Sequence, residues 1–142
     1  MQLHDVARAP APDPSATLFG MVADAMILQD EAAAVLAGVG RREHLGVVAP
    51  RGGPLVHRFF TLRDRLPLED RCSRAGRLSD QLDTILLHHA LQVATSLEFL
   101  AVEGRSERLA AQLSAYPGLG PPAELLESIY RELRDERDRQ QA

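Results

Sequence analysis

Apolar residues recur at intervals of three and four positions through residues 15–38. The apolar positions are Leu18, Met21, Val22, Ala25, Met26, Leu28, Ala32, Val35 and Leu36. Residues with this spacing lie on one face of a helix, so the pattern predicts an amphipathic helix ended by the glycines that follow. The preceding stretch, residues 1–14, carries three prolines among small residues and is expected to be a flexible leader.

The next two segments differ sharply in composition. Residues 38–54 hold five glycines and two prolines, a pattern typical of a loop. Residues 55–66 place Leu55, Phe59, Leu62 and Leu66 on one side and are expected to form a short helix. Pro67 disfavours helix in the residue before it and marks the next boundary.

Residues 68–102 contain one potential helix breaker, Gly76. One apolar stripe runs through the segment and comprises Leu68, Cys72, Ala75, Ser79, Leu82, Leu86, Ala90, Val93, Leu97 and Leu100. The second half also carries Ile85, Leu91 and Phe99 on the opposite face, so it is apolar nearly all round. A helix of that kind is buried on more than one side, and we expect it at the centre of the fold.

A shorter helix over 107–116 and a last helix over 123–142 complete the pattern, separated by a Pro- and Gly-rich turn. From residue 135 onward the last helix is charged and is expected to be a solvated, frayed end. The sequence therefore predicts an all-α fold with a single helical domain over 15–134. We expect a helical bundle of four main helices plus one or two short ones, with one long central helix.

Composition narrows the class of protein. A chain of 142 residues with 45% hydrophobic and 25% charged residues suits one globular domain. All sixteen basic residues are Arg, and Asn is absent too, which we attribute to codon usage in a GC-rich bacterial genome. The net charge of −4 argues against nucleic-acid binding. One cysteine, no signal peptide and no long apolar run favour a cytoplasmic protein without a membrane segment.

Two adjacent histidines, His88 and His89, lie in the most apolar run of the chain, TILLHHALQVA. Neighbouring helix positions diverge by about 100°, so the pair does not suit one metal ion. No Glu-x-x-His, His-Glu-x-x-His or Cys-x-x-Cys motif is present. A metal site that combines His88 or His89 with the distant His44 or His57 stays open. We expect no metal and no cofactor, with His89 bonded in a core or interface and His88 on a polar face.

The candidate nucleophiles, the serines and Cys72, also lack a recognisable catalytic motif. No serine lies in a Gly-x-Ser-x-Gly context. Cys72 has arginine-rich neighbours that favour the thiolate, yet it falls on the apolar stripe, where a buried inert thiol is the commoner case. Without a catalytic constellation, we expect the protein not to be an enzyme.

A cluster of arginines extends through the short helix and the start of the long one. Seven arginines stand against three acids between Arg51 and Arg77. Arg71, Arg74 and Arg77 form a row along the long helix, with Gln81 and His88 further along the same side. Such a row can hold a phosphate- or nucleotide-like anion. Alternatively, it is a solvated face that pairs with acids of the first and last helices, and we favour this second interpretation.

The long apolar helix also predicts the state of assembly. A helix this apolar often completes its core across a two-fold axis, so we expect a homodimer. The expected interface residues are Leu82, Leu86, His89, Val93, Leu97 and Leu100. The function that follows is a non-enzymatic regulatory module that binds a partner protein through helix faces. The alternative is a regulator that binds a small anionic ligand through the arginine row.

Overall fold

The computed structural model describes residues 14–41, 43–67, 70–103 and 118–141, which form four helices and no strand. The helices are α2 (Pro14–Gly40), α3 (Leu45–Asp64), α4 (Arg74–Glu103) and α6 (Pro121–Gln141). The all-α helical bundle expected from the sequence is confirmed. The expected leader, apart from Pro14, and the expected short helix over 107–116 lie outside the described residues.

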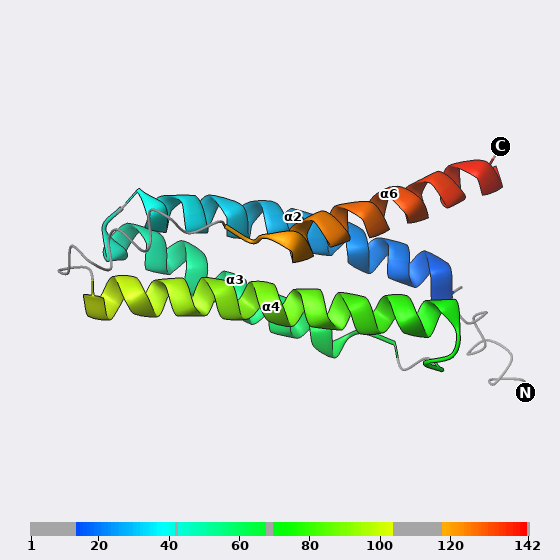
Figure 1. Cartoon of the computed structure of the whole chain (residues 1–142), viewed down its shortest axis with the longest axis horizontal. Coiled ribbons are helices and arrows are strands. Elements are labelled where there is room, and N and C mark those ends of the chain that lie inside the picture. The colour runs from blue at the N-terminus through cyan, green and yellow to red at the C-terminus, as the bar shows by residue number, and fades with distance from the viewer. Residues whose placement is uncertain (1–13, 42, 68–69, 104–117, 142) are drawn as a thin grey trace, which may run out of the picture.

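Consecutive helices run in opposite directions along a common long axis (Figure 1). Each of α2 and α4 contacts the other three helices, whereas α3 and α6 do not touch within the described chain. Helix α3 therefore lies on one side of the α2–α4 pair and α6 on the other. The C-terminal part of α6 extends beyond the remaining helices (Figure 1).

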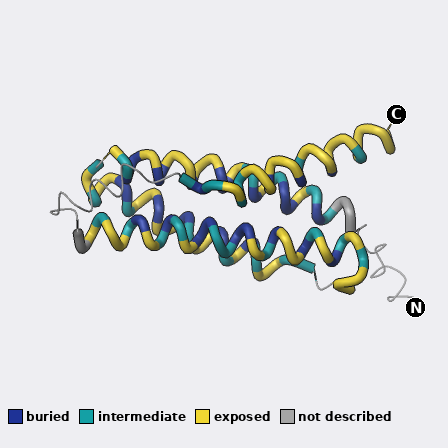
Figure 2. The backbone as a smooth tube through the Cα atoms, in the orientation of Figure 1, coloured by how far each residue is buried: buried dark blue, intermediate teal, exposed yellow. Residues whose placement is uncertain are grey.

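The core lies between the helices and draws apolar side chains from all four of them. Phe59 of α3 is completely buried, as are Leu86 and Val93 of α4 and Leu126 of α6. Buried positions line the inner sides of the bundle, while the end of α6 is exposed almost all round (Figure 2). The hydrophobic effect thus holds α6 mainly through residues 126–133, where Leu126, Ile129 and Leu133 are buried.

Helix α3 corrects the expectation of a loop over residues 38–54. It begins at Leu45, capped by the His44 side chain, which accepts a hydrogen bond from the Gly46 amide at 3.0 Å. A Cβ atom at Gly52 would lie 2.8 Å from Leu97 Cδ1, so this glycine allows α3 to approach α4 closely. Gly52 is itself a core position, and packing there overrides the low helix propensity of the segment. The expected short helix over 55–66 is the second part of this longer helix.

Helix α4 begins at Arg74 rather than at residue 68, because residues 70–73 form a turn. Ser73 Oγ accepts a hydrogen bond from the Gly76 amide at 3.0 Å and so acts as the N-cap. A Cβ atom at Gly76 would lie 1.9 Å from the Asp70 carbonyl oxygen, so the turn folds directly onto this glycine. Gly76 therefore lies in the first turn of α4 and not in the middle of a longer helix.

Helix α6 continues to Gln141, through the residues expected to fray. Aromatic contacts fasten it to the start of α2. The rings of Phe19 and Tyr130 stack with centroids 5.8 Å apart, and the Arg137 guanidinium lies 4.9 Å from the Phe19 ring centroid. A cation over an aromatic face is a favourable contact, so charged residues of α6 contribute to its packing.

Candidate functional site

The two adjacent histidines each bind a different part of the fold. His88 Nε2 lies 3.2 Å from the carbonyl oxygen of Leu119, in the turn before α6. Because a carbonyl accepts and cannot donate, this hydrogen bond requires a proton on His88 Nε2. Gln92 Nε2 lies 3.4 Å from the same ring nitrogen. His89 Nε2 lies 2.7 Å from Oε1 of Gln29 on α2, and both side chains are buried. The diverging directions expected for the pair are therefore observed.

Gln29 links His89 to the start of α6. Its Nε2 donates to the Ala123 carbonyl at 3.3 Å, which leaves Oε1 facing His89. His89 must therefore carry its proton on Nε2, and its Nδ1 is buried without a hydrogen-bond partner in the described structure. Burial, with a smaller repulsion from His88, lowers the pKa of His89 from 6.5 to about 4. The ring is neutral near pH 7 and connects α2, α4 and α6.

A surface groove lies between α4 and the first turn of α6, next to His88. Its volume is about 570 Å³, and most of the surface that lines it is apolar. The lining residues are Asp80, Gln81, Thr84, Ile85 and His88 from α4, with Pro121, Pro122 and Leu125 from α6. We call it the α4–α6 groove. It brings together two of the expected ligand-binding residues, Gln81 and His88.

The arginine row does not line this groove. Arg74 Nη2 lies 2.9 Å from Glu132 Oε1 and also pairs closely with Glu136, so it bridges α4 to α6. These bonds raise the pKa of Arg74 further and lower the pKa of the Glu136 carboxyl. Arg71 is exposed and lies 3.9 Å from Asp80 Oδ2. Arg77 Nη1 donates to the Cys72 carbonyl at 3.4 Å.

Within this row, Arg71 and Arg74 thus contact carboxylates of the same chain, whereas Arg77 binds a backbone carbonyl. Arg58 pairs with Glu31 of α2 at 3.2 Å in the same manner. Arg63 pairs with Asp83 of α4 at 2.6 Å. Arg71, Arg74 and Arg77 thus each contact different groups of the chain.

The expected dimer-interface residues lie in the chain's own core. Leu82, Leu86, His89 and Val93 have no exposed surface, and Leu97 and Leu100 pack against the same core. Helices α2 and α3 already cover that face of α4, so it is not open to a second copy. A homodimer would require other residues.

Cys72 is exposed, in the turn before α4, and not buried on an apolar stripe. The stripe expectation failed because it extended the helical period through residues 70–73, which are not helical. No three His, Cys, Asp or Glu side chains gather to suit a metal ion in the part of the chain that the structure describes. None of the helices it describes has the length and apolarity needed to cross a membrane.

Sequence reasoning missed Gln29 and the residues that α6 contributes to the groove. Gln29 interrupts the apolar face between Ala25 and Ala32, and that polar residue on a buried face was the available signal. Leu125 gives no such signal, because an exposed leucine on an amphipathic helix is common. No family model, curated protein or solved structure matches the chain.

Proposed function

We propose that the protein is a non-enzymatic interaction module that binds an amphipathic helix of a partner protein in the α4–α6 groove. The observation that carries this proposal is the open, mainly apolar groove of about 570 Å³ between two helices. Ile85 is buried at its base, and Leu125 is 42% exposed at its edge. Amphipathic helices commonly bind grooves of this kind through apolar residues on one face.

Charge at the groove favours a partner with a basic residue. Asp80 lines the groove, with 60% of its side chain exposed. Glu124 is exposed next to Leu125 on α6. A partner helix whose apolar residues are flanked by Arg or Lys would match both the apolar base and these carboxylates.

Hydrogen bonds and an ion pair beside the groove connect α6, and the turn before it, to α4 and α2. His88 binds the Leu119 carbonyl, Gln29 binds the Ala123 carbonyl, and Arg74 bridges to α6 two turns further on. A groove that exists before binding loses less conformational entropy when the partner docks. The homodimer is not part of this proposal, because its expected interface residues are buried in the core.

The proposal is tested with a panel of synthetic helical peptides. Each peptide carries apolar residues at positions i, i+4 and i+7 and one flanking Arg, and binding is measured by fluorescence anisotropy. We expect binding that weakens at least tenfold in Leu125→Arg, which places a cation in the groove. Ile27→Arg is the matched control, since Ile27 is also an exposed apolar residue, on α2 and outside the groove lining.

Two peptide controls sharpen the outcome. A peptide with the same composition but permuted apolar positions is expected not to bind, and an Arg→Glu peptide is expected to bind more weakly. Equal losses in Leu125→Arg and Ile27→Arg would place binding elsewhere. A panel in which no peptide distinguishes the two variants would overturn the proposal.

A further inference from the structure

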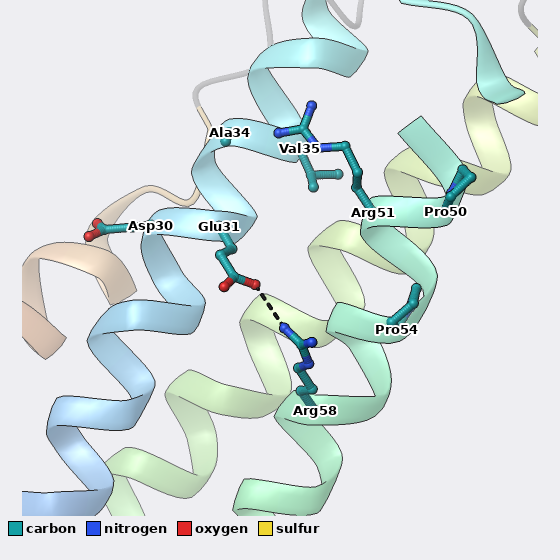
Figure 3. Close-up of a pocket in the computed structure, with 8 residues that line it drawn as sticks. All are labelled: Asp30, Glu31, Ala34, Val35, Pro50, Arg51, Pro54 and Arg58. Atoms are coloured by element: carbon teal, nitrogen blue, oxygen red, sulfur yellow. Dashed lines mark hydrogen bonds and ion pairs between the residues drawn. The ribbon is translucent and has the colours of Figure 1, made fainter. Parts of the chain in front are cut away.

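A second cavity lies between α2 and α3 and shares no residue with the α4–α6 groove (Figure 3). Its volume is about 520 Å³, within the range typical of sites for small molecules. The lining residues are Asp30, Glu31, Ala34 and Val35 from α2, with Pro50, Arg51, Pro54 and Arg58 from α3. We call it the α2–α3 cavity.

The spacing of the lining residues explains the shape of the cavity. Arg51 and Arg58 are seven residues apart, so they project from the same side of α3 with about 10 Å between them along the axis. Pro50 and Pro54 lie on that side and form walls without flexible side chains. Gly52 allows α3 to approach Val35 of α2 closely, because a Cβ atom there would lie 3.3 Å from Val35 Cγ1.

The two arginines differ in their partners. Arg58 Nη1 forms an ion pair with Glu31 Oε2 at 3.2 Å, at one end of the cavity. Arg51 has no carboxylate within ion-pair distance among the residues that the structure describes. Figure 3 shows Arg51 extending toward α2 beside Val35, whereas Asp30 projects away from it. Within the described ranges, one end of the cavity thus offers a guanidinium without a carboxylate partner, next to the largely buried Val35.

We propose that the α2–α3 cavity binds a small amphiphilic carboxylate. The planar Arg51 guanidinium matches a carboxylate in a two-pronged hydrogen bond. The apolar body of the ligand lies on Val35, between the rings of Pro50 and Pro54. The Arg58–Glu31 ion pair closes the other end, where Glu31 repels a second negative charge. The site therefore favours a monoanion with an apolar tail over a phosphate or a dicarboxylate.

The inference does not depend on the function proposed for the α4–α6 groove, and the full chain is used to test it. Octanoate is titrated into ¹⁵N-labelled protein while the amide shifts of Ala34, Val35 and Arg51 are followed. Octanamide tests the need for charge, and acetate tests the need for an apolar body. We expect saturable shifts with octanoate and at least tenfold weaker binding of both control compounds.

Two substitutions test whether Arg51 is the residue that binds the carboxylate of octanoate. Arg51→Gln is expected to weaken octanoate binding at least tenfold. Arg71→Gln, which removes an exposed arginine outside the cavity, is expected to leave it unchanged. Octanamide binding as tightly as octanoate would mean apolar adsorption alone and would overturn the proposal. Undiminished binding by Arg51→Gln would also overturn it.

A third substitution is expected to change which ligand, octanoate or a dicarboxylate, the cavity binds more tightly. Glu31→Gln removes the carboxylate that pairs with Arg58, so that both ends of the cavity carry an arginine without a counterion. Suberate, the dicarboxylate of the same chain length, is then expected to bind several-fold more tightly than octanoate. In the native protein the order is expected to be the reverse. The same order of binding in both proteins would contradict the role given to Glu31.

Discussion

His89 Nε2 donates to Gln29 Oε1 across 2.7 Å, between two helices whose residues here are 60 positions apart in the chain. The bond lies in the core, where neither side chain reaches solvent. Gln29 Nε2 in turn donates a hydrogen bond to the Ala123 carbonyl in α6. A buried polar bond of this kind fixes which residues of α2, α4 and α6 lie opposite one another.

Replacing Gln29 tests the strength of this connection. Gln29→Leu leaves the buried His89 Nε2–H without a partner and removes the bond from Gln29 to the Ala123 carbonyl, so we expect a loss of about 1–3 kcal/mol in the free energy of unfolding. Urea unfolding followed by circular dichroism measures the loss. The double variant Gln29→Leu/His89→Leu removes the orphaned ring as well and is expected to be more stable than the single variant. A single variant as stable as the native protein would show that the bond contributes nothing.

Stability is expected to depend on pH through His89. Its pKa is about 4 when folded and 6.5 when unfolded, so the unfolded chain binds more protons between these values. The contribution of His89 is complete above pH 6.5 and is lost as the pH falls toward 4, by about 3 kcal/mol in total. Urea unfolding between pH 7.5 and 4 tests this in the native protein and in His89→Gln.

The two controls separate His89 from other titrating groups. His57, which is exposed on α3, is replaced in His57→Gln, and this variant is expected to retain the native pH dependence. The difference between the native protein and His89→Gln is expected to shrink as the pH falls from 6.5 to 4. A constant difference over this range would contradict the shifted pKa.

Arg74 is expected to hold the second half of α6 against α4. Its pairs with Glu132 and Glu136 are partly exposed, so Arg74→Ala should cost no more than about 1 kcal/mol in global stability. Hydrogen exchange of amides in residues 130–137 should nevertheless accelerate, and high salt should produce the same effect in the native protein. Arg131→Ala, at an exposed position of the same helix, is the control and should leave exchange nearly unchanged. Equal acceleration in both variants would mean a general loss of helicity.

Two glycines in helices are expected to respond oppositely to alanine. Gly76→Ala places a Cβ atom 1.9 Å from the Asp70 carbonyl oxygen, so the turn at 70–73 must move, and we expect destabilisation by about 2 kcal/mol or more. Gly20→Ala meets no atom within 4 Å and should stabilise α2 by up to about 1 kcal/mol. Thermal unfolding of both variants measures the contrast. A stabilised Gly76→Ala would show that the turn does not rest on this glycine.

The sequence predicted the all-α fold and the helices with uninterrupted apolar periodicity, because local spacing determines which face of such a helix is buried. It misjudged the first half of α3, because Gly52 and the two prolines lower the local helix propensity. The segment is helical because Val48, Gly52 and Leu55 are buried against neighbouring helices. It also misjudged residues 70–73, where a side-chain cap ends the periodicity. Both errors concern positions at which tertiary contacts outweigh local preference.

The candidate sites were less accessible to sequence reasoning. Gln81 and His88 share a groove because they lie on one helix face, which the spacing indicates. Their partners Pro121 and Leu125 come from another helix, and no periodicity reports which helix packs there. Arg74 was recognised as part of a row, but its carboxylates at positions 132 and 136 became evident only from the packing of α6 on α4.

The absence of contact between α3 and α6 in the described chain has a consequence for synthesis on the ribosome. Helices α2, α3 and α4 contact one another and precede α6 in the chain, so their shared core can form while α6 is still being made. We therefore expect helix α6 to dock last, onto a surface that α2 and α4 already form. On this order the α2–α3 cavity forms before the α4–α6 groove, because α6 is one wall of the groove.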